Sequence, residues 1–154
     1  MNIWRTLRAV RSRALTLALP DRTLTLVDDS YNANPDSVHA AIDVLAELPG
    51  PRLLVLGDMG EVGDQGPQFH AEAGAYAAQQ GIEHVLLLGE LASHALPACP
   101  GARHFASIAE LCAAAHALLA QVSSVLVKGS RFMKMERVVE ALRPSGMPQE
   151  VSPC

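Results

Sequence analysis

Hydrophobic residues along this chain alternate between short strand-like runs and longer helical stripes. Leucines alternate with smaller or polar residues over 15–19 and 24–28, on either side of a Pro-Asp-Arg turn, which predicts a β-hairpin. Continuous apolar runs at 52–56, 84–88 and 124–127 predict strands that are buried on both faces, and 103–106 an edge strand. Helices are predicted at 35–48, 67–80, 91–96, 107–119 and 132–142. This alternation predicts an α/β fold with a doubly wound, mostly parallel sheet and helices on both faces.

The chain has the length of one domain, with 154 residues and no linker long enough to divide it. We predict the folded domain over 14–143. Residues 1–13 are rich in arginine and contain no acid, and we interpret them as an N-terminal extension that is partly disordered or left over from where the chain was cut. Residues 144–154 contain Pro, Ser and Gly and are predicted to form a loose tail.

Composition excludes several classes of protein. A net charge of −4 gives no electrostatic basis for binding nucleic acid. No apolar run approaches the roughly 18 residues of a membrane-spanning helix. The three cysteines include no Cys-x-x-Cys pair, and the six histidines lack metal-ligand spacing, so we expect free thiols, no metal site and a cytoplasmic location.

The first candidate site is the stretch from Asp29 to Pro35, which joins a predicted strand directly to a helix. Ligands bind at such strand ends in open α/β sheets. A carboxylate at Asp29 can accept from both ribose hydroxyls, and an amide at Asn32 presents a donor and an acceptor to a base. We predict nucleotide binding by Asp29, Tyr31, Asn32 and Asn34, although Asn34 is also a good N-cap before Pro35. Tyr31 can stack on a base or pack under the loop, and part of the polar set can serve only the turn.

A second candidate loop is the glycine-rich segment 57–63. Its spacing is not Gly-x-Gly-x-x-Gly and it does not lead straight into a helix, so it is not a dinucleotide fingerprint. Asp58 and Glu61 are candidate substrate-binding residues. The alternative is that both acids are loop residues exposed to solvent, with no role in binding.

The third candidate loop, Lys128-Gly129-Ser130-Arg131, lies between a predicted strand and a predicted helix start, where backbone N–H groups favour anions. It is not a P-loop. Lys128, Ser130 and Arg131 offer a point charge, a hydroxyl and a planar fork, suited to a carboxylate or an acyl phosphate. We predict all three as catalytic residues and Lys128 and Ser130 also as substrate-binding residues. The alternative is a surface helix cap with solvated cations.

These three segments, taken in order and followed by Met135-Glu136, resemble the C-terminal domain of the Mur ligases, over roughly residues 14–143. The resemblance implies a Rossmann-like fold and an ATP-dependent ligase of peptidoglycan synthesis that uses Mg²⁺. Within the family, Asn32 with the inserted Ala33-Asn34 is most similar to the branch that joins D-alanyl-D-alanine to UDP-N-acetylmuramoyl-tripeptide. The resemblance further implies that Asp29 and Asn32 contact the ATP ribose and adenine, and that 128–131 lie near the incoming dipeptide.

The sequence contains no glycine-rich lysine loop for ATP phosphates. It therefore resembles the C-terminal domain alone, with Mg²⁺ held mainly by a central domain. We expect the isolated chain to be inactive and to have the N-terminal and central ligase domains as its partners. Two alternatives stay open: a free-standing α/β module that binds a nucleotide or a partner, and a ligase domain of the folylpolyglutamate synthetase type. An ATPase domain encoded upstream in the same reading frame would exclude the free-standing module.

Overall fold

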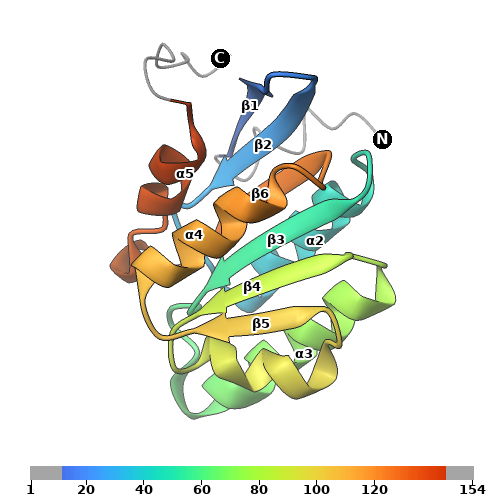
Figure 1. Ribbon diagram of the computed structural model, residues 1–154. Helices are drawn as coiled ribbons and strands as arrows, with labels where there is room; N and C mark the ends of the chain where they lie inside the picture. Colours follow the sequence, from blue (N-terminus) through green and yellow to red (C-terminus); the bar gives the residue numbers. More distant parts are fainter. Residues whose placement is uncertain (1–11, 145–154) are drawn as a thin grey trace.

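The computed structural model describes residues 12–144, which contain a six-stranded sheet with the order β1-β2-β6-β3-β4-β5 (Figure 1). The first strand is antiparallel to the second, and the other neighbours are parallel. The strands are β1 (Arg13–Ala18), β2 (Thr23–Asp29), β3 (Arg52–Gly57), β4 (His84–Leu88), β5 (Ala102–Phe105) and β6 (Ser124–Lys128). The hairpin and the mostly parallel sheet are confirmed.

The α-helices are α2 (Pro35–Ala46), α3 (Gly66–Gln79), α4 (Ile108–Leu118) and α5 (Glu136–Leu142). Short 3₁₀ segments are η1 (Gly63–Gln65), η2 (Ala92–Ala98) and η3 (Arg131–Met133). In Figure 1, α4 and α5 lie on one face of the sheet, and α2 and α3 on the other. The core is divided in the same way, because Leu126 of β6 packs with α2 and α3 while its neighbours Val125 and Val127 pack with α4 and α5. The doubly wound architecture is therefore confirmed.

Local signals in the sequence explain where the helices begin and end. The Asn34 side chain accepts from the Ser37 N–H at 2.9 Å, and the Ser37 hydroxyl accepts from the Asn34 N–H at 3.0 Å. This capping box starts α2, with Pro35 as its first residue. Gly81, just beyond the end of α3, has the left-handed φ of 78° that favours glycine. Ser107 caps α4 through the Glu110 N–H, as its position predicts.

Two predicted boundaries are wrong, and one short helix is of the 3₁₀ type. Residues 132–142 do not form a single helix, because Lys134 adopts a left-handed φ of 53° between η3 and α5. The short helix predicted at 91–96 is present as the 3₁₀ helix η2, over Ala92–Ala98, which contains Pro97. Arg13, assigned to the N-terminal extension, is the first residue of β1 and pairs with Asp28 of β2. Most of that extension and nearly all of the predicted tail lie outside the described residues.

The order of the strands brings the three candidate loops together. Strand β6 comes last in the chain but lies between β2 and β3, so the carboxyl ends of these three strands are neighbours. The first loop (29–34) follows β2, the second loop (57–63) follows β3, and the third loop (128–131) follows β6. All three lie at the same edge of the sheet (Figure 1).

Candidate functional site

Backbone hydrogen bonds join the three loops into one unit. The Gly60 N–H of the second loop donates to the Ala33 carbonyl of the first loop at 2.9 Å. The Ser130 N–H of the third loop donates to the Asp58 carbonyl of the second loop, also at 2.9 Å. The second loop is thus held to both of its neighbours, and the position of each loop depends on the other two.

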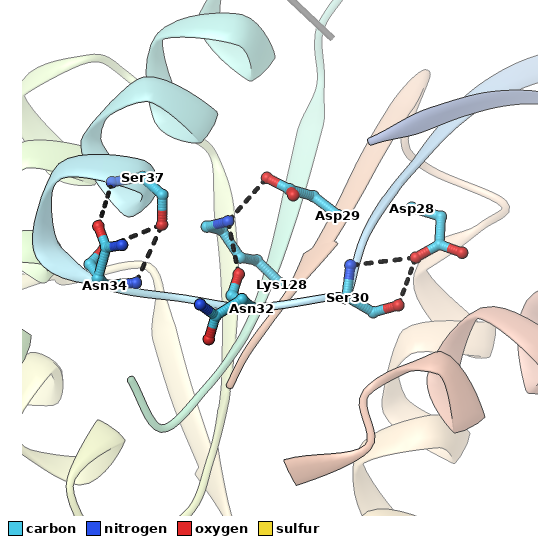
Figure 2. Close-up of polar contacts among 7 residues, drawn as sticks. All are labelled: Asp28, Asp29, Ser30, Asn32, Asn34, Ser37 and Lys128. Carbon is cyan, nitrogen blue, oxygen red and sulfur yellow. Dashed lines mark hydrogen bonds and ion pairs between the residues drawn. The ribbon is translucent and has the colours of Figure 1, made fainter. Parts of the chain in front are cut away.

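Lys128 lies at the centre of this unit, with its side chain only 2% exposed. Its ammonium donates to Asp29 Oδ2 and to the Asn32 carbonyl, each at 2.9 Å (Figure 2). The Asp29 side chain is equally buried, at 3% exposed. Sequence reasoning treated Lys128 and Asp29 as separate ligand-binding groups, whereas the structure pairs them with each other across 99 residues of chain.

Burial raises the pKa of the Asp29 carboxyl to about 6, and the attraction and hydrogen bond of Lys128 limit that rise. The carboxylate of neighbouring Asp28 contributes a smaller increase. At neutral pH the Asp29 carboxyl is therefore ionised, but a pKa of about 6 means that the ionised form is only slightly favoured over the protonated form. Removing the ammonium would leave a buried charge that the surroundings disfavour.

Asp28 points to the opposite side of the sheet from Asp29, as alternation along a strand requires. Its Oδ1 accepts from the Ser30 N–H at 3.1 Å and from the Ser30 hydroxyl at 2.5 Å (Figure 2). Its Oδ2 accepts from the Arg13 guanidinium at 2.6 Å. The first loop is consequently anchored on both faces of β2.

The outer side of the first loop presents Tyr31 and Asn32. Both side chains are exposed, so packing under the loop does not describe Tyr31. The guanidinium of Arg131 lies over the Tyr31 ring, 5.1 Å from its centroid, a cation–π arrangement. Asn34, by contrast, uses its side-chain oxygen to cap α2. Of the four predicted nucleotide-binding residues, Tyr31 and Asn32 therefore offer the accessible side chains.

The two acids of the second loop differ in their surroundings. Asp58 accepts the Ala92 N–H at 2.7 Å, which fixes the start of η2, so it is not a solvated loop acid. Glu61 is exposed and has a left-handed φ of 58°, an uncommon conformation for a residue other than glycine. The structure places Glu61 at the surface of the unit and Asp58 inside it.

His70, which the sequence analysis included only among the six scattered histidines, holds the second loop in place through its ring nitrogens. It is fully buried, its Nδ1 lies 2.7 Å from the Gly66 carbonyl, and its Nε2 accepts the Met59 N–H at 2.9 Å. These partners require the neutral ring protonated on Nδ1, and burial lowers the pKa of His70 accordingly. The only signal in the sequence was its position one turn into a helix that follows a glycine-rich loop.

The third loop is held by Met135, whose buried side chain packs against two glycines. A Cβ on Gly129 would lie 2.5 Å from Met135 Cγ, and one on Gly57 would lie 2.8 Å from Met135 Sδ. Only glycine leaves room for this contact between the ends of β3 and β6.

A pocket of about 530 Å³ opens beside Tyr31, on the face of the sheet that carries α5; we call it the Tyr31 pocket. Its lining comes from the ends of the hairpin, the first and third loops and the start of α5: Arg13, Asp28, Ser30, Tyr31, Arg131, Lys134 and Glu136. Sequence reasoning did not single out Lys134, and it used Glu136 only within the Met135-Glu136 pair that contributes to the resemblance. Ser130 is buried nearby and holds the third loop through its backbone.

Comparison with known proteins identifies the family of this chain. Residues 15–131 match the family model described as "Mur ligase, glutamate ligase domain". The chain belongs to this Mur ligase family. The Mur ligase match covers all three loops and the strands that carry them, and it confirms the resemblance stated above.

Curated Mur ligases support the same assignment in more detail. The UDP-N-acetylmuramoyl-tripeptide–D-alanyl-D-alanine ligase of Escherichia coli (strain K12) is 45% identical over 143 residues, which are 91% of this chain and 31% of that protein. The ligase of the same name from Bacillus subtilis (strain 168) is 36% identical over 86% of this chain and 31% of its own length. The chain thus spans about 31% of these curated relatives.

Solved structures of Mur ligases share the fold. MurF from Acinetobacter baumannii superposes with a TM-score of 0.74 at 34% identity, covering 83% of this chain and 29% of that one. MurF ligase from Thermotoga maritima, solved in complex with ADP, gives a TM-score of 0.69 at 25% identity, covering 77% of this chain and 28% of the other. The Rossmann-like Mur ligase fold is therefore established for the described residues.

Proposed function

We propose that this chain serves as the C-terminal domain of an ATP-dependent ligase that joins D-alanyl-D-alanine to UDP-N-acetylmuramoyl-tripeptide in peptidoglycan synthesis. The observation that carries the proposal is the joining of the three motif loops at one sheet edge, in a chain 45% identical to the E. coli ligase of that name. Both curated relatives described above carry this name, which favours this function over a folylpolyglutamate synthetase type.

In the proposed reaction, ATP phosphorylates the terminal carboxylate of the tripeptide, and the amine of D-alanyl-D-alanine then attacks the acyl phosphate and expels phosphate. This domain contributes to the binding of the nucleoside and the acceptor, and its closure over the substrates excludes water from the acyl phosphate. Phe132, 88% exposed beside Arg131, supports the idea that another domain covers this edge.

For the nucleoside, we propose that Asn32 and Tyr31 make the direct contacts, through the amide and the ring. Asp29 is the family position for the ribose, but its carboxylate is buried against Lys128 in the described conformation. Contact between Asp29 and a ribose therefore requires the first loop to move. Lys128 acts in this proposal as a positioning residue that sets the first loop, and any contact with the reacting phosphate follows the same movement.

For the acceptor, Arg131 is the accessible cation of the third loop and Ser130 its hydroxyl. Glu61 is exposed on the second loop, while Asp58 acts by holding η2. Among residues 12–144, no three His, Cys, Asp or Glu side chains are grouped so as to hold a metal ion. The Mg²⁺ that accompanies ATP is accordingly assigned to the central domain, and the chain is proposed to need both other ligase domains for catalysis.

A chimaera tests the proposal. The segment of the E. coli ligase that matches this chain would be replaced by the chain itself, and phosphate release would be measured with ATP, UDP-N-acetylmuramoyl-tripeptide and D-alanyl-D-alanine together. We expect release that depends on all three substrates, whereas the 154-residue chain alone gives none. A chimaera that is folded by circular dichroism and binds ADP, yet does not use D-alanyl-D-alanine, would contradict the proposal.

A further inference from the structure

The loop that follows β4 is connected to the three candidate loops, although no motif marks it; we call it the fourth loop (89–91). Strand β4 pairs with β3 in parallel, so the fourth loop lies next to the second loop at the same edge of the sheet (Figure 1). Its first residue, Gly89, has a left-handed φ of 110°, which favours glycine. The fourth loop leads directly into η2, which begins at Ala92.

The side chain of Asp58 connects the second loop to the fourth loop. Its Oδ1 accepts the Ala92 N–H at 2.7 Å. The same carboxylate lies so close to Gly89 that a Cβ there would overlap Oδ1 and lie 2.8 Å from Oδ2. No ion pair within residues 12–144 involves Asp58. The carboxylate therefore serves this contact as an oxygen acceptor, and its charge has no partner in the described part of the chain.

The fourth loop and η2 give this contact a fixed base. Ala92 and Ala95 are buried in the core cluster that includes α3, and a Cβ on Gly74 of α3 would lie 2.5 Å from the Ala95 carbonyl oxygen. Such close packing leaves η2 little room to shift. On the other side, His104 Nε2 of the edge strand β5 donates to the Gly89 carbonyl at 2.8 Å. The fourth loop is thus anchored to both α3 and β5.

The backbone of Asp58 holds the third loop. Its carbonyl accepts the Ser130 N–H at 2.9 Å, and Ser130 directly precedes η3, which begins at Arg131. The residue that contacts η2 through its side chain is therefore the one that contacts the third loop through its main chain. A displacement of the Asp58 carboxylate is transmitted to Ser130 within a single residue.

We infer that Asp58 is a positioning residue of the proposed ligase, which sets the third loop against η2 without touching a substrate, and that Gly89 and His104 support it. The inference rests on the proposed function, in which the third loop meets the acceptor. A positioning role requires an oxygen acceptor at residue 58, whereas the substrate-binding role expected from the sequence uses the negative charge. The first loop is also anchored separately, through Asp28 and Gly60, so the effect on ATP should be small.

Steady-state kinetics of the chimaera separate these two roles of Asp58. Asp58→Ala removes the acceptor and should raise the KM for D-alanyl-D-alanine about tenfold, as expected for one lost hydrogen bond. Asp58→Asn removes the charge but keeps an oxygen acceptor, so its KM for the dipeptide should stay within about threefold of wild type. The KM for ATP should change by less than about twofold in both variants.

Gly89→Ala tests the same contact without altering Asp58. The added Cβ displaces the carboxylate, so the KM for the dipeptide should rise about as much as in Asp58→Ala. The matched control is Gly81→Ala, because Gly81 also has a left-handed φ, of 78°, but nothing lies within 4 Å of its Cβ position. Gly81→Ala should leave the KM unchanged. His104→Leu should raise the KM about threefold, and His104→Gln, which keeps a side-chain donor, should not.

Hydrogen exchange of the Ser130 amide measures the coupling directly in the 154-residue chain. Asp58→Ala and Gly89→Ala should speed exchange of the Ser130 N–H about tenfold, because the carbonyl that accepts it is no longer held. Asp58→Asn and Gly81→Ala should exchange at the wild-type rate.

Equal rises in the KM for the dipeptide in Asp58→Asn and Asp58→Ala would assign Asp58 to the substrate itself and overturn the inference. An unchanged KM in Asp58→Ala, or equal effects of Gly89→Ala and Gly81→Ala, would overturn it as well. Failure of the proposed function is distinct, because it appears as a wild-type chimaera that does not use D-alanyl-D-alanine. The exchange rates of Ser130 then still decide whether Asp58 positions the third loop.

Discussion

Replacing Lys128 by methionine should destabilise the domain in a way that depends on pH. The substitution keeps the length of the side chain but removes the ammonium that donates to Asp29 and to the Asn32 carbonyl. Since both charged side chains are almost fully buried, the lost pair leaves a carboxylate without a partner. Breaking a buried ion pair in this way costs about 3–5 kcal/mol.

The pH dependence follows from the pKa of Asp29. In the wild type it is raised from 3.8 to about 6, so the stability that protonated Asp29 contributes is complete below pH 3.8 and is lost as the pH rises through 6. Lys128 lowers this pKa, so in Lys128→Met it is higher still and the loss continues above pH 6. The extra destabilisation should grow by about 1.4 kcal/mol per pH unit there. Below pH 6, the cost of Lys128→Met comes only from the lost hydrogen bonds and is about 1–3 kcal/mol.

Urea unfolding followed by circular dichroism at pH 5 and pH 8 measures the cost of Lys128→Met at each pH, provided that the m-value is unchanged. The matched control is Arg13→Met, which breaks the pair with Asp28. That pair is shorter, at 2.6 Å, but Arg13 is 30% exposed, so we expect a cost below about 1 kcal/mol at either pH. Asp29→Asn added to Lys128→Met should remove the pH dependence. Equal costs for Lys128→Met and Arg13→Met at pH 8, or a cost for Lys128→Met that does not vary with pH, would refute the reasoning.

Three further predictions concern the same loops. His70→Phe leaves the buried Met59 N–H without an acceptor and should cost about 1–3 kcal/mol. Because burial lowers the pKa of His70, this residue's contribution to stability should shrink as the pH falls below 6.5, so the difference in unfolding free energy between wild type and His70→Phe should be smaller at pH 5 than at pH 7.5. Gly129→Ala should cost about 1–3 kcal/mol by overpacking, whereas Gly60→Ala, whose nearest Cβ contact is 3.4 Å, should be close to neutral in thermal unfolding. ADP and adenosine should bind the isolated chain about equally, near millimolar, and Asn32→Ala should weaken both in an NMR titration; shifts that centre on 128–131 and grow with phosphate number would contradict this.

Local patterns predicted most of the elements because each strand and helix carries its own signal. The Asn34-Pro35 start of α2 and the apolar runs of β3, β4 and β6 needed no knowledge of the fold. The boundary near residue 132 failed for a specific reason. Phe132 has the spacing of an apolar stripe with Met135, yet it lies exposed, and only Met135 is buried.

The pairing inside the site could not be predicted from the sequence. Lys128 and Asp29 meet because β6 inserts beside β2, and no local pattern determines which strands become neighbours. A lysine and an aspartate in two separate motifs suggest two ligand-binding groups until the order of the strands is known. The Tyr31 pocket poses the same difficulty, because its lining comes from both ends of the domain.

The central place of β6 has a consequence for how the protein is made. A growing chain on the ribosome emerges from its N-terminus, so β2 and β3 are both synthesised long before β6, the strand that separates them in the finished sheet. Until residues 124–128 appear, β2 and β3 each present an open strand edge of the kind that promotes mispairing and aggregation. Until β6 has been synthesised, the carboxylate of Asp29 also lacks the ammonium of Lys128 as its partner. Arrival of β6 thus completes the sheet and assembles the three-loop unit in one late event, and a nascent chain that stops short of it has neither.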